Sequence, residues 1–271
     1  MDEPDPPTAA QLGVSPGEYE RIMRDLQRRQ VATGAEFAAL RLPPARQRRP
    51  GQPRVWLGVV GVILVVVVLW RPVATDWREP DPVYAFMMTA GDRPVTYSSC
   101  RPIQVAVYPS GGPPDAEALV REAVALLRAA TGLDISVIGS FGGHAPNWNF
   151  RTATVTAEDP ISVSWQDQDA LARMTEDVAG LGGSPYVPTP SGGQRFVAGS
   201  IALSRTYYAQ WDEQGWHEEE LAVMLHEFGH VLGLAHVHSR RELMNEDNVG
   251  LTHFGPGDLQ GLRLLGQGPC V

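Results

Sequence analysis

Three histidines and a glutamate near the C-terminus form the pattern in this chain that is best suited to chemistry. His226, Glu227, His230 and His236 lie in the stretch HEFGHVLGLAH, which reads H-E-x-x-H-x-x-G-x-x-H. Three imidazoles at this spacing can hold one zinc ion and leave a fourth coordination position open. Because the glutamate beside the first histidine can activate a water there, the pattern predicts hydrolysis of peptide bonds.

The spacing also predicts the local structure. On an α-helix, residues i and i+4 lie on one face, so His226 and His230 can grip the same ion, and Glu227 is rotated by about 100° from them. A third ligand on the same helix would lie too far along it. Gly233 can end the helix and turn the chain, which brings His236 back as the third ligand.

The alternative to a metal site is a metal-free histidine cluster. A short H-E-x-x-H pattern arises by chance in many unrelated chains. The full pattern needs three of only seven histidines, together with a glutamate and a glycine, at fixed positions. The metal site is therefore the preferred interpretation.

The eleven residues resemble the signature of the metzincin clan of zinc endopeptidases. Those enzymes also place a methionine in a tight turn beneath the metal, and Met244 follows His236 by eight residues, the spacing typical of the matrixin branch. The resemblance implies zinc binding by the three histidines, Glu227 as general base and acid, and Met244 as a structural floor. Without the resemblance, Met244 would read equally well as a core methionine in a loop.

The resemblance extends over roughly residues 98–268 and implies an α/β (α+β) fold. It would have a mixed, mostly parallel sheet, an active-site helix and a small C-terminal subdomain. In this family, backbone near the region 180–203 pairs with an extended peptide substrate as an added strand.

The chain departs from matrixins in several places. Val237 stands where matrixins usually carry serine, and we interpret His238 as a surface residue because a fourth histidine ligand would close the catalytic position. The structural zinc and calcium loops and the cysteine-containing propeptide motif are not recognisable. Asp167 and Asp169 are a weak candidate for Ca²⁺ binding, and a solvated turn is the simpler interpretation.

Residues 55–70 predict a transmembrane helix. The run VWLGVVGVILVVVVLW has sixteen residues and no charge. As a helix it spans about 24 Å, somewhat less than a hydrocarbon core of about 30 Å. Trp56 and Trp70 at its ends suit the two membrane interfaces.

Flanking charges predict the orientation. Residues 41–54 hold five arginines and no acid, whereas Asp76, Glu79 and Asp81 follow the span. The positive-inside rule therefore predicts a single-pass cell-membrane protein with a cytoplasmic N-terminus and an extracytoplasmic catalytic domain. A cleaved signal peptide is the alternative, but its n-region is usually much shorter than 54 residues.

These predictions divide the chain into four parts. Residues 1–54 are a cytoplasmic, partly disordered segment, in which residues 15–42 look helical and are a candidate site for a cytoplasmic partner. Residues 55–70 are a signal anchor and residues 71–97 a stalk. Residues 98–271 are the zinc peptidase domain.

Cys100 and Cys270 are the two cysteines, and they bracket that domain. Because an extracytoplasmic compartment permits disulfides, we expect a bridge between them. It would stabilise the fold by on the order of 4–5 kcal/mol in the chain-entropy description. The competing idea is that Cys100 binds the zinc in a latent form.

Charge excludes one class of partner. The net charge is −9, and residues 1–54 hold nine arginines and seven acids, so the excess of acid lies in the remainder. The predicted extracytoplasmic part is therefore acidic and lacks the cluster of basic residues that nucleic-acid binding requires.

Elements of the globular part follow from periodicity and turn residues. We expect strands over 103–108, 133–138, 152–156, 161–165 and 196–203. We expect helices over 115–130, over a segment that begins at His217 or at the acids that follow it, and over 257–265. The first strand, helix and second strand form a right-handed β-α-β unit. Residues 180–195 read as a long loop, and residues 211–216 as a connection.

The predicted function is a membrane-anchored zinc endopeptidase that acts on protein or peptide substrates. One alternative is a catalytically silent, zinc-bound binding or sensor module at the cell surface, although such a module would not need Glu227. Another is an interaction protein that works through its cytoplasmic helix.

Overall fold

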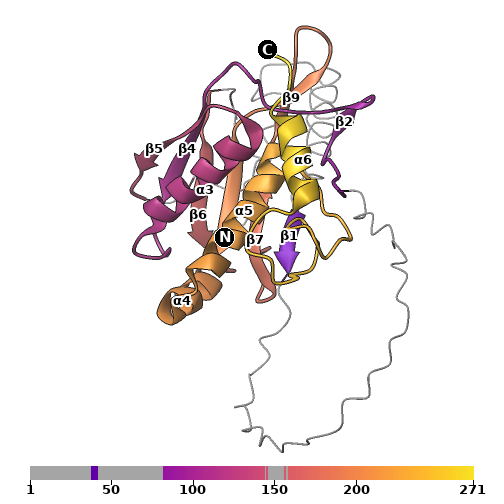
Figure 1. The fold of residues 1–271 in the computed structure, drawn as a ribbon. Coiled ribbons are helices and arrows are strands. Elements are labelled where there is room, and N and C mark those ends of the chain that lie inside the picture. Colours follow the sequence, from indigo (N-terminus) through magenta and orange to yellow (C-terminus); the bar gives the residue numbers. More distant parts are fainter. Residues whose placement is uncertain (1–37, 42–81, 144, 146–155, 157) are drawn as a thin grey trace, which may run out of the picture.

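The computed structural model describes residues 38–41, 82–143, 145, 156 and 158–271 (Figure 1). Its central sheet contains β1 (Ala38–Arg41), β4 (Ile103–Tyr108), β5 (Ile135–Ser140), β6 (Ile161–Gln166), β7 (Val178–Gly183) and β10 (Gly199–Ser204). The strand order is β1-β7-β10-β6-β4-β5. Strands β10, β6, β4 and β5 are parallel, and β7 is antiparallel to β10. The predicted mixed, mostly parallel sheet is confirmed.

Four helices complete the described part: α3 (Ala116–Thr131), α4 (Arg205–Gln214), α5 (His217–Leu232) and α6 (Pro256–Leu265). Helix α3 contacts β4 and β5, helix α5 contacts β7 and β10, and the two helices contact each other (Figure 1). They therefore cover the same face of the sheet. Two short hairpins, β2 (Thr89–Ala90) with β3 (Arg93–Pro94) and β8 (Tyr186–Pro188) with β9 (Gln194–Phe196), lie outside the sheet.

The β4-α3-β5 unit forms as its sequence predicts. Leu119, Val120 and Leu127 recur at helical spacing and are fully buried against the sheet. Gly132 ends α3 with a φ of 75°, a conformation that glycine adopts at low cost. The chain then returns through β5, which pairs in parallel with β4.

Two predicted connections are wrong because they contain regular structure. Residues 180–195, expected as a loop, hold most of β7 and the hairpin β8–β9. Residues 211–216, expected as a connection, include the last turn of α4, which ends at Gln214. Tyr208 and Trp211 give α4 a buried face that its polar sequence hides.

The expected stalk over residues 71–97 is also wrong at its C-terminal end. Val95 and Tyr97 are buried in the main core, and Phe86 forms a β-bridge with Leu234. Residues 82–97 therefore belong to the packed domain, and the domain begins before residue 98.

Part of the N-terminal segment is extended rather than helical. Residues 38–41, within the expected helical region 15–42, form β1 and pair antiparallel with β7. The open edge of β7 offers ladder hydrogen bonds that override weak local helix propensity.

The predicted membrane helix stays a prediction. Among the helices that the structure describes, none is long and apolar enough to cross a bilayer. Residues 55–70 lie outside the described residues, as do residues 152–155 of an expected strand.

The predicted disulfide is present. Cys100 and Cys270 are bonded, with their Cα atoms 5.1 Å apart. Beside the bond, the Val271 amide donates to Ser98 Oγ at 3.1 Å. The bridge ties the C-terminus to the segment that leads into β4, so Cys100 is not a metal ligand here.

Candidate metal centre

Helix α5 positions the first two histidines and the glutamate. It begins at His217, as predicted, with Glu218, Glu219 and Glu220 in its first turn. Acidic side chains stabilise this positive end of the helix dipole. The helix then enters the core, where His226 and Glu227 are completely buried. An imidazole and a carboxylate buried this deeply need specific polar or ionic partners.

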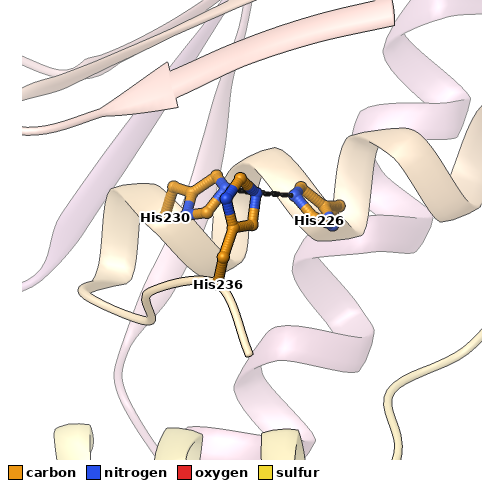
Figure 2. Close-up of side chains that lie close together, drawn as sticks. All are labelled: His226, His230 and His236. Atoms are coloured by element: carbon orange, nitrogen blue, oxygen red, sulfur yellow. Dashed lines mark hydrogen bonds between the residues drawn. The ribbon is translucent and has the colours of Figure 1, made fainter. Parts of the chain in front are cut away.

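The turn after α5 delivers the third histidine. Gly233 has a φ of 120°, and its amide donates to the Gly229 and His230 carbonyls. The Leu234 amide donates to the Gly229 carbonyl at 2.8 Å, which completes the reversal. His236 then lies opposite the helix, with its side chain aimed at the other two rings (Figure 2).

The three rings converge through one nitrogen each. His226 Nε2 and His230 Nε2 lie 3.0 Å apart, and each lies 3.1 Å from His236 Nε2. These atoms form a nearly equilateral triangle (Figure 2). The structure thus brings together all three histidines that the sequence predicted.

Backbone carbonyls fix the tautomers of the two helical histidines. His226 Nδ1 donates to the Leu243 carbonyl and His230 Nδ1 donates to the Leu234 carbonyl, both at 2.8 Å. A carbonyl oxygen can only accept, so the proton of each neutral ring lies on Nδ1 and its Nε2 presents a lone pair. Lone pairs that face one another at about 3 Å repel unless a cation lies among them.

Burial keeps the rings neutral. Desolvation, followed by the neighbouring His236, lowers the pKa of His226 to about 3. Desolvation also lowers the pKa of His230 well below its ordinary value, and the pKa of His236 is lowered for the same reason. Neutral imidazole is the form that binds metal.

The triangle fits zinc. Two Zn–N bonds of 2.0–2.1 Å at a tetrahedral angle place their nitrogens about 3.3–3.4 Å apart. The observed separations of 3.0 and 3.1 Å are close to this value. Three nitrogen ligands and an open fourth position are typical of a catalytic rather than a structural zinc site.

Strand β7 makes room for Glu227. A Cβ on Gly180 would lie 2.6 Å from Glu227 Cγ and 2.7 Å from Oε1. A Cβ on Gly182 would lie 2.9 Å from Glu227 Oε2. Gly180 and Gly182 are two residues apart, so they lie on the same face of β7. This face is directed toward α5, and it carries no side chain where Glu227 lies.

Met244 lies under the helix. It is 1% exposed, and a Cβ on Gly229 would meet its sulfur at 2.5 Å. The Met244 carbonyl accepts from the Val237 amide at 2.9 Å, which ties the methionine turn to the chain just after His236. The polarisable thioether therefore packs against α5 at Gly229, which lies between His226 and His230 in the sequence.

Two buried carboxylates hold the methionine turn. Asp258 accepts from the Leu243 amide at 2.5 Å and from the Gly255 amide at 2.9 Å. Glu242 accepts from the amides of Gly257 and Asp258, at the N-terminus of α6. Burial raises the pKa of Asp258 to about 6, even though these backbone donors favour its ionised form.

The remaining candidates are not part of the histidine cluster. His238 is a surface residue whose Nδ1 is 2.9 Å from Glu246. Asp167, one of the two candidate calcium ligands, accepts from Arg205 at 2.7 Å and from the Ala170 amide. In the part of the chain that the structure describes, the three histidines are the residues whose ligand atoms lie close enough together to hold one metal ion.

Sequence reasoning missed Gly180, Gly182, Glu242 and Asp258. Glycines at i and i+2 could have indicated a strand closely approached by another element. The two acids gave no such signal, because the carboxylates of Asp and Glu usually lie at the surface.

Comparison with known proteins agrees with this geometry. The matrixin family model matches residues 143–252. The matched region contains α5, the three histidines, Glu227 and Met244. A search of curated proteins found no match to the chain.

Proposed function

We propose that this chain, whose matched region and histidine cluster are those of a matrixin-like metzincin, is a zinc-dependent endopeptidase with Glu227 as its general base. The observation that carries the proposal is the set of three neutral Nε2 atoms within 3.1 Å of one another, next to a buried carboxylate. His226, His230 and His236 would hold the ion. Zinc there would supply Lewis-acid chemistry, polarising a carbonyl and acidifying water.

The chain's own residues would do the rest. Glu227 would accept a proton from the attacking water and deliver it to the leaving amine. The Leu243 and Leu234 carbonyls would hold His226 and His230 in the ligating tautomer throughout. In this structure, β1 pairs antiparallel with the outer edge of β7, so this edge can accept an added strand. An extended peptide substrate would pair with the same edge in place of β1.

Anchoring in the cell membrane is part of the proposal. The uncharged run over residues 55–70 and the arginines before it support a single-pass protein with its catalytic domain extracytoplasmic. The disulfide supports a compartment that permits oxidation.

The test compares full-length wild type with Glu227→Gln. We expect one zinc per chain in both, and peptide cleavage in the wild type alone, with turnover reduced by at least about 10³-fold in the variant because the proton acceptor is lost. Zinc content and cleavage of a mixed peptide library are measured on the same samples. Zinc without cleavage in either protein would favour a silent binding module, and equal cleavage in both would refute the role of Glu227.

A further inference from the structure

A pocket of about 160 Å³ lies directly beside the metal centre. His226 forms part of its wall, and the other walls come from α4, α5 and the segment that follows the methionine turn. Its apolar lining consists of Trp211, Ala222, Val223, Leu243, Val249 and Leu251. A cavity of roughly 150 Å³ is known to hold benzene, so this pocket can take one side chain of moderate to large size.

Two carboxylates also line the pocket. Glu219 comes from the first turn of α5, Asp247 comes from the segment after Met244, and no lining residue is arginine. Both side chains are exposed. Neither carboxylate forms an ion pair with any residue in the described ranges. An apolar pocket with two exposed acids suits a side chain that has an apolar stem and a cationic end.

We infer that this pocket receives an arginine or lysine side chain of the substrate, at the residue immediately beside the scissile bond. The inference rests on the proposed peptidase function. The stem would pack on Val223 and Leu243, and the charged head would lie between Glu219 and Asp247. Acidic side chains would be disfavoured by the same two carboxylates, so the enzyme would cut beside basic residues.

The test uses two peptides that differ in one atom group. One carries arginine beside the scissile bond, and the other carries citrulline, which has the same length and no charge. For full-length wild type we expect kcat/KM to be about tenfold higher with arginine, the effect of two partly solvated charge pairs. Raising the salt from about 0.05 M to about 0.5 M should reduce that ratio, because exposed charges are screened.

Variants assign the preference to the pocket. In Glu219→Gln/Asp247→Asn, the ratio of arginine to citrulline should fall to about 1. Glu218→Gln removes an equal charge from the same helical turn without touching the pocket, and it should leave the ratio unchanged. A ratio near 1 in the wild type, or a ratio that the double variant keeps, would overturn the inference.

A binding measurement separates this inference from the proposed function. Zinc-loaded Glu227→Gln protein is titrated with the same two peptides, labelled for fluorescence anisotropy. Tighter binding of the arginine peptide, lost on adding the two pocket substitutions, would support the pocket assignment even if the wild type cleaves nothing. Cleavage by the wild type with equal binding of both peptides would support the peptidase and refute the pocket assignment.

Discussion

Glu227 shows how closely the residues around the metal centre depend on one another. Its carboxylate is buried beside His226, and β7 accommodates it only because Gly180 and Gly182 carry no side chain. The proposed general base and the bare strand are separated by more than forty residues of sequence. A defect in either should therefore appear as a defect in the same function.

Gly180→Ala tests this dependence. The added Cβ would overlap Glu227 Cγ at 2.6 Å, so either the glutamate or the strand must shift. We expect a loss of about 1–3 kcal/mol in unfolding free energy from overpacking. We also expect kcat/KM to fall by about 10²-fold, because the carboxylate is displaced from its working position.

Gly142→Ala is the matched control, because a Cβ there meets nothing within 4 Å. Thermal unfolding and peptide cleavage are measured on both variants. Wild-type activity in Gly180→Ala would show that Glu227 does not need the bare face of β7.

Glu220 gives a pH prediction at the residue scale. Burial, and then the carboxylates of Asp115 and Asp212, raise the pKa of Glu220 from 4.5 to about 7. Between these two values the unfolded chain ionises while the folded chain holds its proton, so the folded state loses stability as pH rises from 4.5 to 7. Glu220→Gln should therefore be more stable than wild type above pH 7, by about 1–2 kcal/mol after allowance for solvent screening.

Urea unfolding at several pH values measures the effect. The two proteins should have nearly equal stability below about pH 3.5, where the glutamate is protonated in both states. Glu218→Gln, which changes an exposed neighbour on the same helix, is measured in parallel as the control. A destabilised Glu220→Gln at pH 8 would mean that the buried carboxylate makes a favourable interaction when ionised.

At the scale of elements, α6 supports the metal ligands through the methionine turn. Asp258 on α6 accepts from the Leu243 amide, and the Leu243 carbonyl in turn accepts from His226 Nδ1. The orientation of a ligand on α5 is thereby linked to the start of another helix. Partners of this kind hold a metal-binding histidine in its tautomer and orientation.

Asp258→Ala should weaken zinc binding by about 10- to 100-fold, the usual cost of losing such support. Asp258→Asn keeps one acceptor oxygen for the turn and should cost less. Glu213→Gln, an exposed acid on α4, is the control. Competition with a zinc chelator gives the affinity, and equal affinity in Asp258→Ala and wild type would refute the link.

Helices and strands whose sequence shows one strong periodicity could be predicted. The histidine spacing predicted α5 and the return of His236, because ligand geometry leaves little freedom. The apolar repeat of α3 and the run Ile103–Tyr108 gave their boundaries to within a residue or so. These signals are local, so tertiary contacts only strengthen them.

Elements that depend on distant partners were not predictable. Strand β7 reads VAGLGG, and its glycines favour a loop until α5 is placed against them. Helix α4 is polar apart from its aromatic residues, and Tyr208 is buried because its hydroxyl finds the Glu220 carbonyl at 2.7 Å. Asp258 reads as a surface acid, although it lies inside the domain among backbone donors.

At the scale of the whole molecule, the fold and the proposed membrane topology place residues 38–41 in different positions. In the structure, β1 pairs with β7, with residue 39 opposite residue 181. If residues 55–70 cross a membrane with the N-terminus inside, residues 38–41 lie on the opposite side from β7. One molecule cannot have both arrangements at once, so anchoring would free the edge of β7 for a substrate.

Ala39→Cys/Leu181→Cys tests which arrangement holds, because opposed strand positions are close enough for an added oxidant to join two cysteines. In intact membranes we expect no cross-link between the two positions. When residues 55–70 are replaced by a flexible polar linker, both segments share one compartment, and we expect the cross-link to form. Peptide cleavage by that linker protein should rise when residues 1–54 are also removed, because β1 no longer competes for the edge. A cross-link in intact membranes would refute the proposed orientation, since it requires the N-terminal segment and the catalytic domain to lie on the same side.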